Sequence, residues 1–162
     1  MTQTLYFESP LGLMMAQEQD GAIIALDFVK SPQPDTAVAQ TPLLLEAKKQ
    51  VLEYFAGLRR GFELPLAPKG TPFQQKVWQA LRAIPYGQTR SYGQIAAQVG
   101  NPRAGRAVGG ANHRNPISLI QPCHRVIGAN GRLTGYGGGL DKKEALLALE
   151  RRVSAEPDEN RA

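Results

Sequence analysis

The stretch SYGQIAAQVGNPRAGRAVGGA, at residues 91–111, decides how the second half of the chain folds. The capping-box pattern of residues 91–94 predicts a short helix that continues through residue 98. Gly100 ends this helix, and Asn101, which precedes a proline, begins the next helix almost at once. Two short helices joined by a few residues that include glycine are typical of a helix-turn-helix.

The second of these helices, over residues 102–111, is built mostly of glycine and alanine. Its three glycines cost about 3 kcal/mol of helix propensity relative to alanine. Small side chains let a backbone approach another surface closely, so with Arg103 and Arg106 the helix could enter a DNA minor groove. Long polar side chains that read base edges are absent, which predicts little sequence preference. A tight helix–helix contact in the core is the alternative explanation.

The flanking sequence predicts an α+β protein with a small N-terminal α/β domain and a mostly helical C-terminal domain containing a winged helix-turn-helix. Residues 1–70 contain three strands separated by turns, a helix that Thr41 caps and Gly57 ends, and a possible last strand over residues 61–66. Residues 71–152 begin with a second capping box and form the other domain. Residues 153–162 are expected to be a disordered tail.

The charge of the chain is unevenly distributed. Residues 1–70 carry six Lys/Arg and eight Asp/Glu, whereas residues 71–152 carry twelve and three, a net charge of +9. Charge of one sign on one half indicates a polyanionic partner such as DNA, although a basic surface without a partner is the alternative. A transmembrane helix is not expected, because the apolar runs are too short. A signal peptide is not expected, because residues 1–10 have neither a basic nor an apolar region, and a membrane partner is not expected, because no helix combines a basic face with a broad apolar one. With a single cysteine, a reducing cytoplasmic location is the expectation.

Cys123 is the single cysteine of the 162 residues, so disulfides and multi-cysteine zinc sites are excluded and no metal is expected. It follows a predicted buried strand over residues 117–120. His124 could act as its base, and the charge of Arg125 favours the thiolate nucleophile. Because adjacent residues of a strand face opposite sides, contact between Cys123 and His124 needs a turn or a bridging water. Inert packing of the thiol is the alternative.

The C-terminal helix offers a group that could orient His124. Asp141 is predicted to cap this helix, with Glu144 completing a capping box. Glu150 falls on or beside the apolar face, where an unpaired carboxylate would be costly. A Cys–His–Glu relay explains that placement, and a salt bridge to Arg151 or Arg152 is the alternative. The glycine-rich residues 135–139 before the helix could bind an anion through backbone N–H groups or form a flexible loop.

These segments resemble the O6-alkylguanine-DNA alkyltransferase family, also called methylated-DNA–protein-cysteine methyltransferases. The matching segments follow the family's order and approximate spacing: Ile84-Pro85-Tyr86-Gly87, Ser91-Tyr92, Arg106-Ala107-Val108-Gly109, Asn115-Pro116, Pro122-Cys123-His124-Arg125-Val126 and Gly138-Gly139-Leu140. The resemblance is strong over residues 71–152. It covers residues 1–70 only in outline, as the family's ribonuclease-H-like domain, and it implies the stand-alone bacterial-type form.

The resemblance implies a set of catalytic roles. Cys123 would accept the alkyl group, His124 would act as a base through a water molecule, and Glu150 would orient His124. Asn115 would bridge the turn near the cysteine. Tyr92 would donate a proton or hydrogen bond to guanine N3.

The resemblance also implies substrate and DNA contacts. The carbonyls of Cys123 and Val126 would hold the exocyclic amine, the backbone of Gly137 would bind O6, and Lys143 would support the site. Arg106 would fill the stack left by the flipped nucleotide. The remaining substrate-binding residues would be Tyr136 and Gly138, and the DNA-binding residues would be Arg106, Ala107, Gly109, Ala111, Tyr92 and Arg125.

The implied function is irreversible transfer of the alkyl group from O6-alkylguanine in duplex DNA to Cys123, with O4-alkylthymine as a further candidate substrate. Each molecule would act once, because no second cysteine could resolve the thioether, and no cofactor is needed because the lesion supplies the alkyl group. The protein is expected to be a monomer, and cooperative binding on DNA stays open. A non-catalytic sensor of alkylated DNA is the alternative, and a winged-helix transcription factor is a further one.

Overall fold

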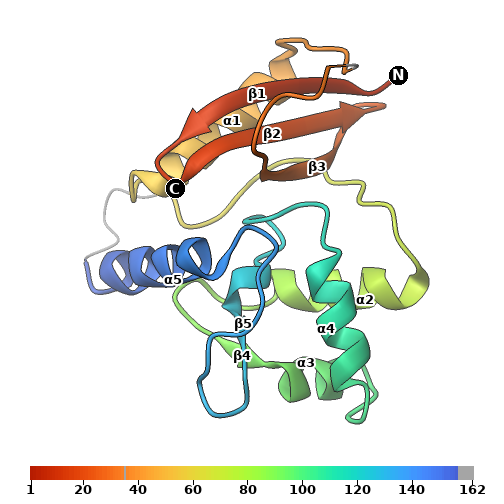
Figure 1. Cartoon of the computed structure of the whole chain (residues 1–162), viewed down its shortest axis with the longest axis vertical. Helices are drawn as coiled ribbons and strands as arrows, with labels where there is room; N and C mark the ends of the chain where they lie inside the picture. Colours follow the sequence, from red (N-terminus) through yellow and green to blue (C-terminus); the bar gives the residue numbers. More distant parts are fainter. Residues whose placement is uncertain (35, 157–162) are drawn as a thin grey trace. The chain divides into compact units, whose positions relative to one another are not determined.

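The computed structural model describes residues 1–34 and 36–156, and its elements are labelled in Figure 1. The chain separates into two compact units, the first running from Met1 to Pro68 and the second beginning at Lys69. A small sheet unit followed by a mainly helical unit is the α+β architecture that the sequence predicts. Among the described residues, no helix is both long enough and apolar enough to cross a membrane.

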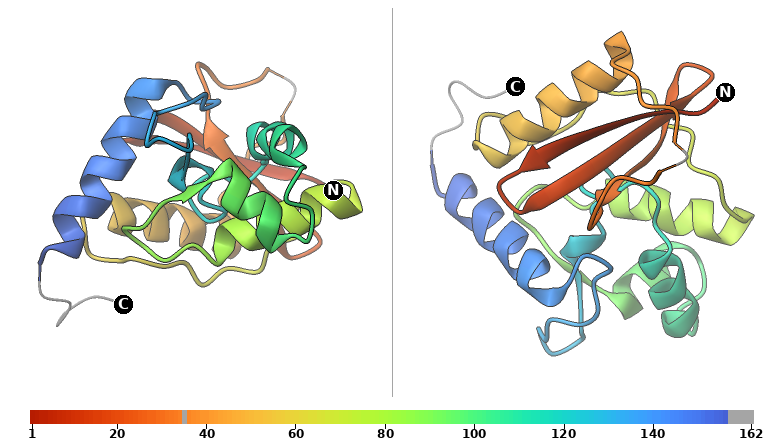
Figure 2. Two further views of the ribbon diagram at one scale, coloured as in Figure 1. Left: turned by 90° about the horizontal axis from the view of Figure 1, so that it is seen from below. Right: turned by 45° about the horizontal axis from the view of Figure 1, so that its top comes forward.

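The first unit is an antiparallel sheet covered on one face by a helix (Figures 1 and 2). Its strands β1 (Gln3–Ser9), β2 (Gly12–Gln19) and β3 (Ala22–Phe28) pair in chain order. Helix α1 (Pro42–Phe55) contacts all three strands, and Thr41 caps it by accepting a hydrogen bond from the backbone of Leu44. The apolar side chains buried in this unit are those of Leu5, Phe7, Met14, Ala16, Ile23, Leu26, Leu44, Ala47, Val51 and Tyr54.

The strand predicted over residues 61–66 does not form. Instead, Leu66 makes an isolated parallel bridge with Ile23. Pro65 has no N–H to donate, and the N–H of Glu63 donates to the side-chain oxygen Oε1 of Gln50 at 2.9 Å, so the ladder does not extend toward residue 61.

The second unit contains the paired helices. Its elements are α2 (Pro72–Arg82), β4 (Arg90–Ser91), α3 (Tyr92–Gln98), α4 (Gly105–His113), the 3-10 turn η1 (Cys123–Arg125), β5 (Val126–Ile127) and α5 (Leu140–Ser154). Two of the three predicted capping boxes are present, at the starts of α2 and α3. Helices α2, α3 and α4 contact one another around a buried apolar cluster centred on Trp78, whose Nε1–H donates to the Ala111 carbonyl at 2.8 Å.

Two local predictions in this unit are wrong. Helix α4 begins at Gly105 rather than at Asn101, because the Asn101 side chain accepts the N–H of Arg103 and holds a turn before the helix. Residues 118–120 form turns and Ile117 is only a single bridge residue, so the predicted strand does not form. Asn115 Oδ1 accepts the N–H of Ile117 at 3.0 Å, and the following backbone folds back on itself with Leu119 at a φ of 69°.

The start and end of α5 also differ from the prediction. Gly139 is the N-cap residue, with a φ of 105°, and Asp141 lies within the first turn of the helix instead of capping it. The helix continues to Ser154, so the first two residues of the expected tail are helical. Residues 157–162 of that tail lie outside the described residues.

Candidate functional site

Cys123 begins a single turn of 3-10 helix, not the strand end that the sequence suggested. Its N–H donates to the Gln121 carbonyl at 2.7 Å, and the N–H of Arg125 donates to the Pro122 carbonyl at 2.9 Å. Consecutive residues of a 3-10 helix project about 120° apart, so the opposed directions expected on a strand do not apply. Cys123 is 6% exposed and belongs to the buried cluster of the second unit.

His124, Glu150 and Arg125 form a buried ionic cluster between η1 and α5. His124 Nε2 lies 2.7 Å from Glu150 Oε2. The Arg125 guanidinium donates to both carboxylate oxygens, at 2.8 and 2.9 Å, and to the Ile84 carbonyl at 2.8 Å. The N–H of Gly87 adds a hydrogen bond to Glu150 Oε1 at 3.2 Å. Glu150 is thus held by partners from 25 and 63 residues earlier in the chain, not by the neighbouring arginines considered from sequence.

The cluster sets the charge of each member. Burial alone would raise the pKa of Glu150, but the hydrogen bonds and charges of His124 and Arg125 outweigh it and hold that pKa far below its usual range. Burial lowers the pKa of His124, and the charges of Arg125 and Lys143 lower it further against the opposing effect of Glu150. At neutral pH the cluster is therefore an ionised Glu150, a charged Arg125 and a neutral His124.

Neutral His124 has one ring nitrogen available as a proton acceptor. With Nε2–H donating to Glu150, the lone pair lies on Nδ1. Nδ1 is buried and has no hydrogen-bond partner among the described residues. A buried polar atom of this kind commonly bonds to a water molecule or to a ligand.

Asn115 and Gln121 form a reciprocal pair that shapes the backbone leading to Cys123. Asn115 Nδ2 donates to the Gln121 carbonyl at 2.7 Å, and Gln121 Nε2 donates to Asn115 Oδ1 at 2.6 Å. Arg82, at the end of α2, donates to the Gln121 side chain. The Gln121 carbonyl also accepts the Cys123 N–H, so Asn115 does lie across the turn that precedes the cysteine.

Lys143 of α5 links the Val126 backbone to the loop that carries Thr134. Its fully buried ammonium donates to the carbonyls of Val126 and Thr134, at 2.6 and 2.9 Å. Burial lowers the pKa of Lys143, while the nearby charge of Cys123 acts in the opposite direction. The Tyr92 hydroxyl lies 2.7 Å from Thr134 Oγ1. Thr134 therefore connects Lys143 with Tyr92, and Lys143 binds Val126 directly.

The predicted substrate loop and DNA-facing helix differ in exposure from residue to residue. Gly137 is exposed, and Tyr136 and Gly138 are half-buried. On α4, Arg106 and Ala107 are exposed and Gly109 is half-buried. Tight packing explains the small residues on the buried face of α4, and entry of its exposed face into a minor groove stays a prediction.

Two residues predicted to contact DNA are buried instead. Ala111 is 3% exposed and packs in the cluster around Trp78. Arg125 is 6% exposed because its guanidinium is bound to Glu150 and to the Ile84 carbonyl. Neither side chain is accessible to DNA, so these two expectations are corrected.

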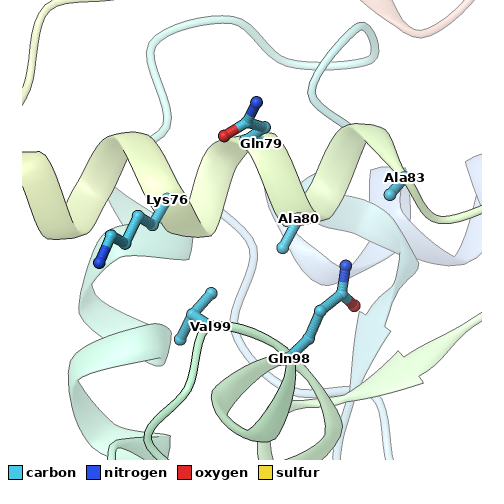
Figure 3. Close-up of a pocket in the computed structure, with 6 residues that line it drawn as sticks. All are labelled: Lys76, Gln79, Ala80, Ala83, Gln98 and Val99. Atoms are coloured by element: carbon cyan, nitrogen blue, oxygen red, sulfur yellow. The ribbon is translucent and has the colours of Figure 1, made fainter.

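A solvent-open groove of about 410 Å³ lies between α2 and the end of α3 (Figure 3). It is lined by Lys76, Gln79, Ala80, Ala83, Gln98 and Val99. None of these six residues is a member of the ionic cluster of His124, Arg125 and Glu150, although Ala80 belongs to the buried apolar cluster that includes Cys123. In the part of the chain that the structure describes, no three His, Cys, Asp or Glu side chains gather where they could hold a metal ion.

Sequence reasoning overlooked three residues that contact the predicted site. Gly87 lies in the recognised 84–87 segment, where a glycine soon after a proline signals a turn and the φ of 79° agrees, but nothing there signalled a contact with Glu150. Gln121 and Thr134 carried no signal, because their partners are residues remote along the chain.

Comparison with known proteins places both units in one family. Residues 72–152 match the model of the 6-O-methylguanine DNA methyltransferase DNA-binding domain, and residues 1–68 match that of the ribonuclease-like domain of the same proteins. A methylated-DNA–protein-cysteine methyltransferase of Methanosarcina acetivorans is 53% identical over 149 residues, which cover 89% of this chain and 95% of that protein. The constitutive enzyme of Bacillus subtilis is 52% identical, over 91% of this chain and 93% of its own length.

A solved structure agrees with these sequence matches. The crystal structure of Mycobacterium tuberculosis OGT in complex with DNA superposes with a TM-score of 0.87 and 45% sequence identity. The match covers 93% of this chain and 94% of that chain.

Proposed function

Because this chain belongs to the 6-O-methylguanine DNA methyltransferase family, we propose that it repairs DNA by transferring the alkyl group of O6-alkylguanine to Cys123. The observation that carries the proposal is the position of Cys123 next to a buried, neutral His124 that Glu150 orients. An ordinary packing cysteine has no need of this arrangement, because burying a carboxylate, an imidazole and a guanidinium together is costly.

The chemical step is a single displacement at the alkyl carbon. The Cys123 sulfur forms a bond to that carbon while the bond from carbon to guanine O6 breaks, and the electron pair of the broken bond stays on the guanine. His124 Nδ1 takes the thiol proton through a bridging water molecule, which a buried and otherwise unpartnered acceptor supports. In net balance the thiol proton ends on the released guanine.

Other residues would hold the base and stabilise the leaving group. The Tyr92 hydroxyl would hydrogen-bond guanine N3 as negative charge develops on the base. The carbonyls of Cys123 and Val126 would accept the exocyclic amine, and the loop residues Tyr136, Gly137 and Gly138 would border O6. The Lys143 ammonium supports this assignment, since it binds the Val126 carbonyl at 2.6 Å and thereby fixes the backbone next to the proposed base contacts.

The base must leave the duplex to reach a buried cysteine. Helix α4 suits this task, because its exposed face carries Arg106 beside small residues that permit close approach to a minor groove. Arg106 would fill the space left in the stack. The net charge of +9 on residues 71–152 would supply phosphate contacts without sequence preference.

Intact-mass measurement after incubation with duplex DNA containing O6-methylguanine tests the proposal. Wild-type protein should gain the mass of one methylene on the peptide that contains Cys123, and Cys123→Ser should gain none. Excess DNA should never add more than one group per molecule. Tight binding of methylated DNA with an unmodified Cys123 would instead favour the sensor alternative, and the same assay with O4-methylthymine defines the substrate range.

A further inference from the structure

Thr134 contacts two residues of the proposed site through different atoms. Its Oγ1 lies 2.7 Å from the Tyr92 hydroxyl, and its carbonyl accepts a hydrogen bond from Lys143 Nζ at 2.9 Å. The same ammonium donates to the Val126 carbonyl at 2.6 Å. Thr134 therefore joins the loop before α5 to helix α3, which begins at Tyr92. Through Lys143 it is also linked to β5, the strand that follows η1.

We propose that Thr134 is a positioning residue for alkyl transfer, whose hydroxyl donates to the Tyr92 oxygen and leaves the Tyr92 proton directed at the guanine. The inference rests on the proposed function, because Tyr92 acts on the base only if this chain transfers alkyl groups. Neither the motifs of the sequence nor the recognised segments assign Thr134 a role.

The direction of this hydrogen bond follows from the donor inventory of the two hydroxyls. A phenol has one proton, so Tyr92 cannot donate to guanine N3 and to Thr134 together. A threonine hydroxyl can reverse its role by rotating its proton, and it becomes the donor once Tyr92 engages the base. Linked hydrogen bonds polarise one another, so a proton from Thr134 makes the Tyr92 hydroxyl a stronger donor.

The hydrogen bond from Thr134 to the Tyr92 oxygen strengthens as alkyl transfer proceeds. As the bond from carbon to O6 breaks, negative charge spreads into the guanine ring and draws the Tyr92 proton toward N3. The phenol oxygen then gains negative charge, and its hydrogen bond from Thr134 strengthens. An interaction that is stronger in the transition state than in the bound substrate raises the rate of the chemical step rather than the affinity.

Both members of the pair are held in place by separate contacts. The Tyr92 ring packs against the buried cluster of the second unit, and a Cβ placed on Gly109 of α4 would lie 3.9 Å from its ring. The Thr134 backbone is held by Lys143. The hydroxyl–hydroxyl contact therefore forms between two groups whose positions are determined by the surrounding structure, which is the condition for preorganised catalysis.

Thr134→Val removes the hydroxyl and keeps the branched shape, so it is the variant of choice. Single-turnover alkyl transfer at saturating O6-methylguanine DNA should slow by roughly tenfold, while the dissociation constant for the DNA stays the same. Thr134→Ser keeps the hydroxyl and should transfer at close to the wild-type rate. Thr134→Ala tests the same loss if the valine variant does not fold.

A modified substrate separates positioning from a purely structural role. In DNA that contains 3-deaza-O6-methylguanine, a carbon replaces N3 and the base offers no acceptor to Tyr92. Thr134→Val should then react as fast as the wild type, and it should add little to the effect of Tyr92→Phe on the normal substrate.

Several outcomes would overturn the inference. They are an unchanged rate in both Thr134→Val and Thr134→Ala, an equal slowing on the two substrates, a serine variant as slow as valine, or a change confined to DNA affinity. A wild-type protein that leaves Cys123 unmodified would contradict the proposed function instead. The two failures are therefore distinguishable in the same set of reactions.

Discussion

At the scale of single residues, Glu150 has the most consequential environment in the second unit. It is 1% exposed, yet its charge is met by Arg125 on both oxygens, by His124 and by the N–H of Gly87. A carboxylate so fully paired stabilises the fold only while every partner is present. The same pairing keeps His124 in the tautomer whose Nδ1 can accept a proton.

Glu150→Gln should destabilise the protein by about 3 kcal/mol, because it leaves the buried Arg125 without its counter-charge. Chemical denaturation of the wild type and the variant measures the loss. The matched control is Glu144→Gln on the exposed side of the same helix, which should change stability by less than about 0.5 kcal/mol. Equal stability of Glu150→Gln and the wild type would contradict the assigned pairing.

His124 should make the protein less stable in mild acid. Burial lowers its folded pKa below the ordinary value of 6.5, so protons bind the unfolded chain more tightly. The contribution of neutral His124 to the unfolding free energy is complete above about pH 6.5. It is lost as pH falls toward and through the lowered pKa that His124 has in the folded state. The lowered pKa of Glu150 acts in the same direction, but only below the ordinary carboxyl value of about 4.5.

Unfolding free energies measured between pH 5 and pH 8 test this sign. They should fall as pH decreases from about 6.5, and His124→Asn should flatten that slope. The exposed His113 provides the control, since His113→Asn should leave the slope as in the wild type. If the unfolding free energy of the wild type instead rises as pH decreases, the folded state stabilises the charged form of His124.

At the scale of elements, helix α4 has one face buried in the core and one face exposed to solvent. Val108, Ala111 and Asn112 are buried, and the Ala111 carbonyl accepts the Trp78 indole N–H. The opposite side exposes Arg106, Ala107 and Gly110. The low helix propensity of its glycines is tolerated because packing against α2 and α3, rather than propensity, holds the helix.

Arg106→Ala should slow alkyl transfer from a fully paired duplex without lowering the thermal midpoint, because Arg106 is exposed. If Arg106 replaces the flipped base in the stack, the defect should shrink when the lesion is in single-stranded DNA, where no stack needs refilling. Arg103→Ala is the comparison, since a phosphate contact should matter for both substrates. An equal defect of Arg106→Ala on the two substrates would exclude the stacking role.

At the scale of the whole molecule, the separation of charge assigns DNA affinity to the second unit. DNA binding should weaken linearly with the logarithm of salt concentration, because bound Lys and Arg release counterions from phosphates. Removing one phosphate contact, as in Arg103→Ala, should reduce the magnitude of that slope by about 1. Lys49→Ala in the first unit should leave the slope unchanged, and a similar reduction there would contradict the assignment.

The elements of both units were largely predictable from the sequence, and so was the contact between His124 and Glu150, but not the part that Arg125 takes in it. The capping boxes at Thr71 and Ser91 and the N-cap at Thr41 follow from residues within one turn of each other. The errors at residues 61–66, 101–104 and 117–120 have a common cause. In each segment a side-chain amide of Gln50, Asn101 or Asn115 binds backbone that would otherwise extend a regular element.

The sequence by itself determined the family, the single cysteine and the division of charge, because these depend on residue identity and order. Only the tertiary structure decided that Arg125 neutralises Glu150 instead of meeting DNA, and that Thr134 touches Tyr92. The physical reason is distance along the chain. These partners are 25 and 42 residues apart, and their contacts exist only after α5 has packed against η1 and the loop before α5 has reached α3.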